Sequence, residues 1–394
     1  MRNRRVINER DKGIVLIVIL FIVAMISVLS FGFAVKADRE LSFGENVGVR
    51  MKMDCLSQTG LNYGKSLVMN PQNVSTGSNG YWEGGSELQM EGGSDYFDIT
   101  VAQAISGNTM RCTYNITSEA YRKAGESNIA TSAISGVLRL DPCIGYVQLN
   151  NNGRLGFEVT VNGDVYCGSD LFVEGMIRGD LSTAGSITWY GNNVTGDLKV
   201  GVAECPVSIP ILSTDDYSSV YYIDSQSYHV EVIDANDGDG DLQRVFSASN
   251  PAGVFYCDGD LELKGKTEIT GMLVVKGDLI INNEAITITA VKNFPALLVG
   301  DDIRVVDDEA NLDVTGLTQV NDDIDVTDWD NCRLTFDGAL HVLNGSIKNT
   351  NGTGTSVIIT ADPMAAALKT WSSDGSVEYW MPAGDAFFRS IARN

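Results

Sequence analysis

The chain has 394 residues, with 51 acidic against 28 basic side chains and a net charge of −23. This balance excludes a nucleic-acid partner, because binding phosphate requires a basic face. Only two histidines occur, His229 and His341, so neither a histidine-based metal centre nor a catalytic triad is expected. The length suits two or three domains, although a β architecture can use over about 200 residues as one unit.

The first long feature is an apolar run from Ile14 to Val35 that contains no charged side chain. As a helix it is long enough to cross a bilayer, which takes about 20 apolar residues. The leader before it, residues 1–13, is basic, so everything after the run is expected on the far side of the membrane. The run is longer than the apolar core of a secretory signal peptide, and helix-compatible residues follow it. We therefore expect a retained anchor that contacts the membrane through residues 14–35.

Residues 36–69 are expected to extend that helix. Apolar side chains recur there at roughly helical spacing, although four glycines lower the helix propensity. Residues 14–69 would then form one helix of about 80 Å, ended by Pro71. Residues 70–150 are rich in Gly and Ser and contain short alternating runs, which predicts a small β region close to the membrane.

Seven cysteines occur without any C-x-x-C pair, so zinc or thioredoxin-like chemistry has no support. In an oxidising exterior some of them could form disulfides, but an odd number leaves at least one free or paired between chains. Buried free thiols among strands are the alternative. The seven are Cys55, Cys112, Cys143, Cys167, Cys205, Cys257 and Cys332.

Two N-terminal stretches form a recognisable pattern, KGIVLIVILFIVAMISVLSFGFAVKADREL and, after it, MKMDCLSQTGLNYGKSLV. They resemble type IV pilin-like proteins, in particular PilX-type pilus assembly proteins and the K-type minor pseudopilin of type II secretion. The resemblance implies cleavage by a prepilin peptidase between Gly13 and Ile14. Most pilins carry a register glutamate at the fifth mature position, which here is Val18. Its absence, shared with the K-type pseudopilins, implies a minor or tip subunit. A plain single-span signal anchor is the alternative.

From about residue 155 the chain becomes repetitive. Strands of about four residues alternate with short Gly, Asn and Asp turns, and this pattern at a period near 20 residues predicts a parallel β-helix, expected to be right-handed. The turn glycines and aspartates are interpreted as residues with left-handed backbone angles. An antiparallel sandwich is the competing architecture. Gly-Asp pairs begin at Gly163, Gly179, Gly196, Gly259, Gly277 and Gly300.

The predicted solenoid covers residues 151–362, with a tyrosine-bearing insertion at about 201–252. We expect the insertion to leave the solenoid, pack its aromatic side chains on the flank and return at Gly253. This half of the chain also resembles the polymer-forming-like β-solenoids of PilX-type bacterial surface proteins, on degenerate motifs such as GVFYCDGDLELKG and PALLVGDDIRV. Residues 363–394 are expected to cap an open end of the solenoid, and a docking peptide is the alternative. The aromatic residues of this tail are Trp371, Trp380, Phe387 and Phe388.

The most site-like cluster is the acidic segment DANDGDGD. Calcium needs several oxygen ligands on a flexible loop. With Asp234 at the first position of an EF-hand pattern, Gly238 and Asp239 fall where an acid and a glycine are required. We interpret the segment as a solvated acidic turn, with a loose calcium site as the alternative and no other cofactor. The candidate ligands are Asp234, Asn236, Asp237, Asp239 and Asp241.

A carbohydrate-active enzyme must also be considered, because polysaccharide lyases and hydrolases use parallel β-helices with carboxylates beside a basic residue. Here the aspartates fall at turn positions where Asp is expected anyway, and Arg304 is the only basic residue among them. No catalytic residue is therefore predicted. The aspartates are Asp301, Asp302, Asp307, Asp308, Asp322 and Asp323.

The expected protein is mainly β, with a long N-terminal pilin-like helix followed by a parallel β-helix, and it is not an enzyme. It would cross the inner (cytoplasmic) membrane once and carry an acidic solenoid in the periplasm or at the cell surface. Its partners would be other pilin-like subunits or assembly machinery. The alternatives are a single-span surface protein whose solenoid binds an extracellular protein or polysaccharide, and a β-helical carbohydrate-active enzyme.

Overall fold

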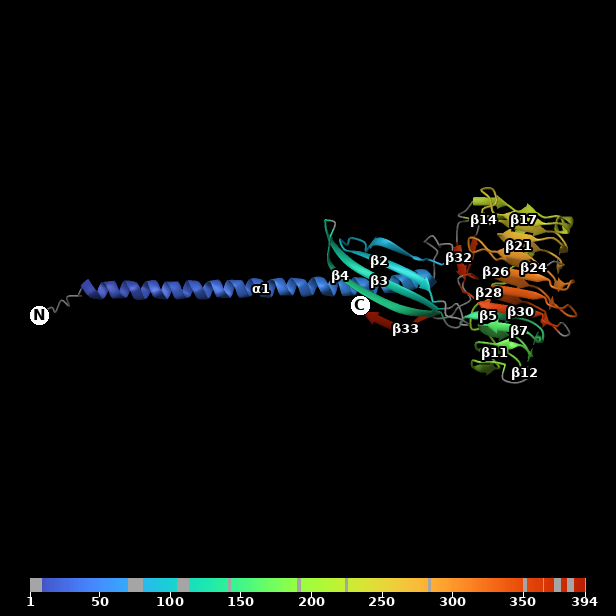
Figure 1. The fold of residues 1–394 in the computed structure, drawn as a ribbon, viewed down its shortest axis with the longest axis horizontal. Helices are drawn as coiled ribbons and strands as arrows, with labels where there is room; N and C mark the ends of the chain where they lie inside the picture. The colour runs from blue at the N-terminus through green and yellow to red at the C-terminus, as the bar shows by residue number, and fades with distance from the viewer. Residues whose placement is uncertain are drawn as a thin grey trace.

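The structure is a computed structural model in which a long helical stalk carries a twisted sheet and, beyond it, a stack of short strands standing across the stalk's axis (Figure 1). It describes residues 9–69, 81–104, 113–125, 127–140, 143–189, 193–223, 226–282, 285–349, 353–363, 365–371, 377–380 and 386–393.

The stalk helix, α1, spans Glu9–Met69 as one 61-residue helix, about 90 Å long at about 1.5 Å per residue. The expected long helix is thus present. Every side chain from Ile14 to Gly48 is exposed. Further along, one stripe is buried, because residues three and four apart share a face of the helix. The stripe consists of Met53, Ser57, Gly60, Leu61, Gly64, Leu67 and Val68.

The C-terminal part of α1 packs on an antiparallel sheet, the stalk sheet, with strand order β1-β2-β3-β4-β33. The strands alternate between buried and exposed side chains, which gives the sheet one apolar face for the helix. At Gly60 of α1 a Cβ would lie 2.2 Å from the Oγ of Ser118, so glycine allows the close approach of helix and sheet. The strands are β1 (Gly84–Gln89), β2 (Tyr96–Gln103), β3 (Thr113–Ala124), β4 (Ser127–Leu140) and β33 (Ala386–Arg393).

The C-terminal strand corrects an expectation. β33 does not cap the solenoid but returns to the stalk sheet, pairing antiparallel with β4 from Ala386 opposite Leu140 to Arg393 opposite Ile134. Its backbone pairs with the edge of β4, which would otherwise stay unpaired. The side chain of Phe388 packs against the core of the stalk. A hairpin of β31 (Leu368–Trp371) and β32 (Val377–Trp380) precedes it. The side chains of Trp371, Trp380 and Phe387 lie outside the described residues.

The solenoid consists of two blocks of short strands joined by a connecting segment. The lower block contains β5 (Ile144–Gln148), β6 (Gly153–Leu155), β7 (Val159–Asn162), β8 (Asp164–Cys167), β9 (Leu171–Val173), β10 (Met176–Ile177), β11 (Leu181–Thr183), β12 (Ile187–Trp189) and β13 (Leu198–Val200). The connecting segment contains η1 (Thr214–Tyr217), β14 (Val220–Ile223) and β15 (Gln226–His229). The upper block contains β16 (Glu231–Val232), η2 (Ala235–Asp239), β17 (Leu242–Val245), β18 (Val254–Cys257), β19 (Leu261–Leu263), β20 (Thr267–Thr270), β21 (Met272–Val275), β22 (Leu279–Ile281), β23 (Ile286–Thr289), β24 (Leu297–Val299), β25 (Ile303–Val305), β26 (Asn311–Val320), β27 (Ile324–Asp325), β28 (Arg333–Val342), β29 (Ile347–Lys348) and β30 (Ser356–Ala361).

These strands build three walls around one apolar core. The first wall is β13-β11-β8-β5-β28-β26-β24-β21-β18-β16, and the second is β12-β9-β6-β29-β27-β25-β22-β19. The third contains β10, β7, β30, β23, β20 and β17 together with the N-terminal parts of β28 and β26, which bend at Gly338 and Gly316. Among the described residues every pairing in these walls is parallel. The predicted parallel β-helix is therefore confirmed, and the sandwich is excluded.

The order of the coils does not follow the order of the chain. β5 begins in the middle of the stack, pairing with β8 on one side and with β28 on the other. The chain winds down to β13, crosses to the far end, resumes at β16 and winds down again until β28, β29 and β30 lie on β5, β6 and β7. The solenoid is thus circularly permuted, with a non-covalent seam between residues 333–361 and 144–162.

Amide side chains join the two blocks across this seam. Gln148 Nε2 donates to the Gly345 carbonyl at 2.7 Å, and Asn349 Nδ2 donates to the Phe157 carbonyl at 2.8 Å. Both side chains are buried. Strand pairing and buried hydrogen bonds together replace the covalent connection that consecutive coils normally have.

The connecting segment runs along the outside of the first wall from its lower to its upper end. We call residues 202–219 the strap. Near its start Tyr166 Oη donates to the Ala203 carbonyl at 3.2 Å, and Val207 packs against Ile144 of β5. In its middle Gln319 of β26 holds the strap by its backbone, accepting from Leu212 N at 3.1 Å and donating to Leu212 O at 2.6 Å.

The aromatic part of the insertion packs on the flank of the upper block. Tyr217 and Tyr221 join a cluster with Val274 and Leu298, which face outward from the first wall. The solenoid resumes at Glu231, earlier than the expected return at Gly253, because β16 and β17 already pair in parallel with β18 and β20.

Replacing Gln319 with alanine is expected to loosen the strap, because two hydrogen bonds to Leu212 are lost at a part-buried site, worth about 1–3 kcal/mol together. Cleavage by glutamyl endopeptidase at Glu204, in the strap, should become at least about fivefold faster under native conditions. Gln243→Ala, at an exposed position of β17, is the control and should leave the rate unchanged. Equal rates for Gln319→Ala and wild type would show that Gln319 does not hold the strap.

Candidate functional site

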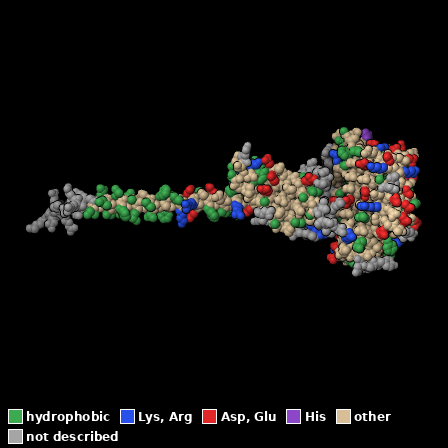
Figure 2. Space-filling model, viewed as in Figure 1, with side chains coloured by type: hydrophobic (Ala, Val, Ile, Leu, Met, Phe, Trp, Pro, Cys, Tyr) green, Lys and Arg blue, Asp and Glu red, His purple; other side chains and the backbone are tan. Residues whose placement is uncertain are grey.

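Among the described residues, exposed large apolar side chains are concentrated in the N-terminal half of α1. Its side chains include Ile17, 70 % exposed, and Leu20, 69 % exposed. Figure 2 shows hydrophobic side chains distributed along this part of the helix, ahead of the charged side chains of the stalk. Among the described residues α1 is the one helix long and apolar enough to cross a membrane. Water-soluble surfaces rarely carry apolar patches of this extent. This surface therefore needs lipid or an apolar partner to cover it.

The predicted cleavage site and the position of the missing register glutamate lie in the part of α1 that does not pack on the stalk sheet. Gly13 is inside α1, four residues beyond its first residue, Glu9. Ile14 is 62 % exposed and Val18 is 49 % exposed. The predicted cleavage position thus lies in the first turns of α1, remote from the stalk sheet.

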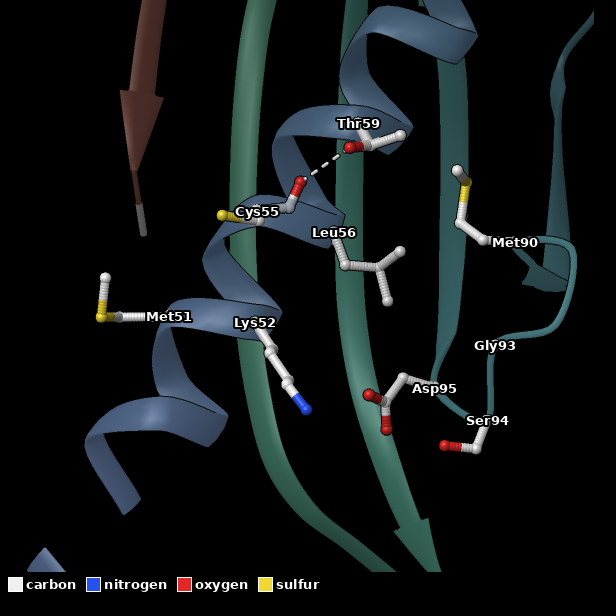
Figure 3. A pocket seen from close by; sticks show the side chains of 9 residues that line it. All are labelled: Met51, Lys52, Cys55, Leu56, Thr59, Met90, Gly93, Ser94 and Asp95. Carbon is white, nitrogen blue, oxygen red and sulfur yellow. Dashed lines mark hydrogen bonds between the residues drawn. The ribbon is translucent and has the colours of Figure 1, made fainter. Parts of the chain in front are cut away.

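A shallow groove of about 370 Å³ lies between α1 and the turn that joins β1 to β2 (Figure 3). Asp95 lies at its rim, but Arg122 already binds it in a bidentate manner, with contacts of 2.6 and 2.7 Å. This guanidinium holds the pKa of Asp95 below its usual range. The rest of the lining combines Lys52 with methionine, leucine, cysteine and small residues, so Asp95 is the one carboxylate that lines the groove. The groove is lined by Met51, Lys52, Cys55, Leu56, Thr59, Met90, Gly93, Ser94 and Asp95.

The acidic segment proposed for calcium is a corner of the uppermost coil. Asp237 Oδ2 lies 3.4 Å from Arg244 Nη2, and Asp239 Oδ1 accepts from Lys264 Nζ at 2.8 Å. Asp241 Oδ1 accepts from the backbone N–H of the next coil at 3.0 Å. Within the described residues no group of three or more His, Cys, Asp or Glu side chains converges as metal ligands do. The candidate ligands Asp234, Asn236, Asp237, Asp239 and Asp241 are instead spread along the corner.

Corner aspartates form a ladder along the solenoid, and two of them, Asp260 and Asp278, come from Gly-Asp pairs. Asp260 Oδ1 accepts from Asp278 N at 2.9 Å, Asp278 Oδ1 from Asp302 N at 3.1 Å, and Asp302 Oδ1 from Asp323 N at 2.8 Å. Asp323 continues the series to Ser346 N at 2.7 Å. Each carboxylate therefore satisfies a backbone donor of the next coil, and hydrogen bonds of this charged kind are stronger than neutral ones.

The glycines of these pairs have a different role from the expected one. Only Gly163 and Gly259 among them adopt positive φ, at 155° and 146°. At Gly300 a Cβ would lie 2.0 Å from the Lys276 carbonyl oxygen, and at Gly277 it would lie 2.2 Å from Asp260 Oδ1. Close stacking of coils, more than left-handed geometry, requires glycine at these corners.

Two of the aspartates considered for catalysis serve this ladder. Asp302 and Asp323 accept backbone N–H groups and also pair with Arg304 and Lys348. Burial raises the pKa of Asp322, with the neighbouring carboxylate of Asp302 adding to the effect. These charges therefore hold coils together.

Removing one ladder carboxylate with Asp278→Ala is expected to lower the free energy of unfolding by about 1–3 kcal/mol. The substitution leaves Asp302 N without its acceptor and removes the partner of Arg304 at 3.1 Å. Asp278→Asn keeps an acceptor oxygen and should recover about half of the loss. Denaturant unfolding measures both, and Asp301→Ala, at an exposed corner, should change stability by under about 0.5 kcal/mol. A loss as large for Asp301→Ala would remove the ladder explanation.

Five of the cysteines that the structure describes, Cys55, Cys167, Cys205, Cys257 and Cys332, are free thiols. Of these, Cys167, Cys257 and Cys332 are buried, which matches the alternative of thiols packed among strands. Burial raises the pKa of the Cys167 thiol, so that side chain stays protonated and apolar. Cys112 lies outside the described residues.

Comparison with known proteins gives little guidance. No protein-family model matches the sequence, and no curated protein is detectably similar to it. Among solved structures the chain is similar to the competence-associated pilin ComZ from Thermus thermophilus, at 9 % sequence identity and a TM-score of 0.29, over 89 % of this chain and 96 % of ComZ. An overlap this loose establishes neither a shared fold nor a shared function.

Proposed function

We propose that the chain is a structural minor or tip subunit of a type IV pilus-like or type II secretion pseudopilus-like assembly. α1 anchors it in the inner membrane, and the acidic solenoid is displayed outside. The observation that carries the proposal is α1 itself, exposed and apolar from Ile14 to Val35 and packed on its own sheet from Met53 onward. A helix that is apolar on every side has to be covered by lipid or by other apolar helices. A subunit that passes from a membrane into a helix-packed filament meets this requirement in both places.

The shape of the solenoid supports a position at the end of such an assembly. Its first wall stacks ten strands within the described residues, which at about 4.8 Å per strand spans about 43 Å. The stack stands across the axis of α1 (Figure 1). Helices packed side by side lie only about 8–10 Å apart. Many neighbouring copies would collide at their solenoids, whereas a single copy at a tip would not.

The test is N-terminal sequencing of the mature protein from cells that express a prepilin peptidase. The expected first residue is Ile14, with a methylated amino group. Gly13→Leu is the matched variant, and it should keep Met1 because the cleavage site is lost. A wild-type protein that begins at Met1 would favour the single-span surface protein, and one that begins beyond Val35 would mean a discarded signal peptide.

A further inference from the structure

The two ends of the solenoid carry different residues at their inward-facing positions. At the upper end β16 pairs with β18, which places Glu231 in the column of Phe255, and β17 pairs with β20, which places Arg244 in the column of Ile269. Phe255 and Ile269 belong to the apolar core, 0 % and 1 % exposed. In parallel strands, residues of one column point the same way. The last upper coil therefore directs a glutamate and an arginine toward the axis.

Arg244 spans the mouth of the solenoid at this end. Its Nε is buried 3.2 Å from Glu231 Oε1, without the alignment of a hydrogen bond, and its Nη2 lies 3.4 Å from Asp237 Oδ2. Arg244 comes from the third wall and Glu231 from the first. Asp237 is on η2, which continues the second wall above β19, where Lys264 N donates to Gly238 O at 2.7 Å. One guanidinium thus connects all three walls across the opening.

The lower end has no counterpart among its described residues. β13 pairs with β11, so Leu198 and Val200 occupy the inward columns of Leu181 and Thr183. Leu181 and Thr183 are 0 % exposed, because β13 covers them. Leu198 is 42 % and Val200 is 65 % exposed, because no coil formed by the described residues lies beyond them. The inward-facing side chains of β13 at the lower mouth are apolar and uncovered.

The direction of the strands alone would allow one solenoid to stack on another. All coils of both blocks run in the same direction, so the backbone at the lower edge of one copy could pair in parallel with the upper edge of a second copy, as β28 pairs with β5 at the seam. Side chains must therefore decide whether the ends join. An inward-pointing charge at a strand edge opposes such pairing, since it would be buried without water.

We propose that the cluster of Glu231, Arg244 and Asp237, the upper plug, closes the solenoid against the lower end of a second copy. The apolar lower mouth would have to bury the plug charges against Leu198 and Val200, so stacking is blocked. The plug thereby fixes the length of the solenoid at one chain. This inference does not depend on the proposed function, because it concerns only the ends of the solenoid.

The experiment measures the mass of the full chain in detergent micelles by sedimentation velocity over a range of protein concentrations, with the detergent contribution subtracted. Glu231→Leu/Arg244→Ile gives the plug positions apolar residues like those below them. We expect its protein mass to rise with concentration to at least twice that of wild type at the same concentration. Electron micrographs should show solenoids joined end to end.

Two further variants make the result specific. The control Gln243→Leu/Glu268→Ile also introduces two apolar side chains, but on outward positions of the third wall, which contains Arg244. Its mass should equal that of wild type. Adding Leu198→Arg to the plug variant places a charge on the lower mouth and should restore the wild-type mass. If the plug variant loses cooperative unfolding, Glu231→Ala/Arg244→Ala, which only shortens the side chains, takes its place.

The proposal is overturned by a folded plug variant whose mass equals that of wild type at every concentration. It is equally overturned if wild type itself joins end to end in micrographs, or if Leu198→Arg leaves the association unchanged.

Discussion

Gly300→Ala is expected to lower the free energy of unfolding by about 2–3 kcal/mol, the upper part of the range for overpacked positions. The new Cβ would lie 2.0 Å from the carbonyl oxygen and 2.8 Å from the carbonyl carbon of Lys276. Backbone of the preceding coil cannot move away easily, because Gly300 N and Asp301 N donate to Val275 O and Gly277 O of that coil. Denaturant unfolding of the full chain in detergent, followed by circular dichroism, measures the change.

The matched control is Gly240→Ala, another glycine that precedes an aspartate at a coil corner. No atom lies within 4 Å of a Cβ at Gly240, and its φ of −137° suits any residue. Its effect should stay below about 0.5 kcal/mol. Similar losses for Gly300→Ala and Gly240→Ala would show that general backbone effects, and not the stacking distance, determine the role of glycine.

The second large effect is a loss of stability in acid caused by His341. Burial lowers the pKa of this imidazole from 6.5 to about 3, so between these values the unfolded chain binds a proton that the folded chain does not. The stability is then complete above pH 6.5 and falls as the pH drops toward 3, by about 1.4 kcal/mol per unit. Over the whole interval the loss amounts to about 4–5 kcal/mol.

His341→Gln removes this titration, so its free energy of unfolding should fall less steeply than that of wild type between pH 6.5 and 4. The comparison isolates His341 because carboxylates titrate alike in both proteins. Parallel curves for wild type and His341→Gln would mean that the folded protein accepts a proton at His341.

The solenoid was predictable because its signal is local. A short strand, a glycine and an aspartate recur within about 20 residues, and each coil repeats them. The ladder function of the aspartates was not predictable, since the acceptor role of Asp278 toward Asp302 N depends on how two coils stack. The same holds for Gly300, where the required close approach comes from a neighbouring coil and not from its own turn.

The permuted order left no trace in the sequence pattern. Tyr146 pairs with Leu340 across the seam, but each is also an ordinary inward-facing apolar residue of its own block. Periodicity alone therefore cannot reveal the seam. The return of β33 to the stalk sheet was missed for a related reason: alternation identifies a strand and not its partner. The upper plug was not predicted from the sequence, because Asp237 was considered only together with the neighbouring acidic residues. Its partner in the structure, Arg244, lies seven residues further along the chain.

The seam also sets the time at which the solenoid can be completed during synthesis. Ribosomes deliver the lower block first, yet the upper edge of β5, β6 and β7 has no partner until β28, β29 and β30 have emerged nearly 200 residues later. Pairings this distant in sequence form slowly, and an unpaired edge invites wrong partners meanwhile. Nascent chains therefore carry an open strand edge through about half of their elongation, and a chain terminated before β28 never closes it.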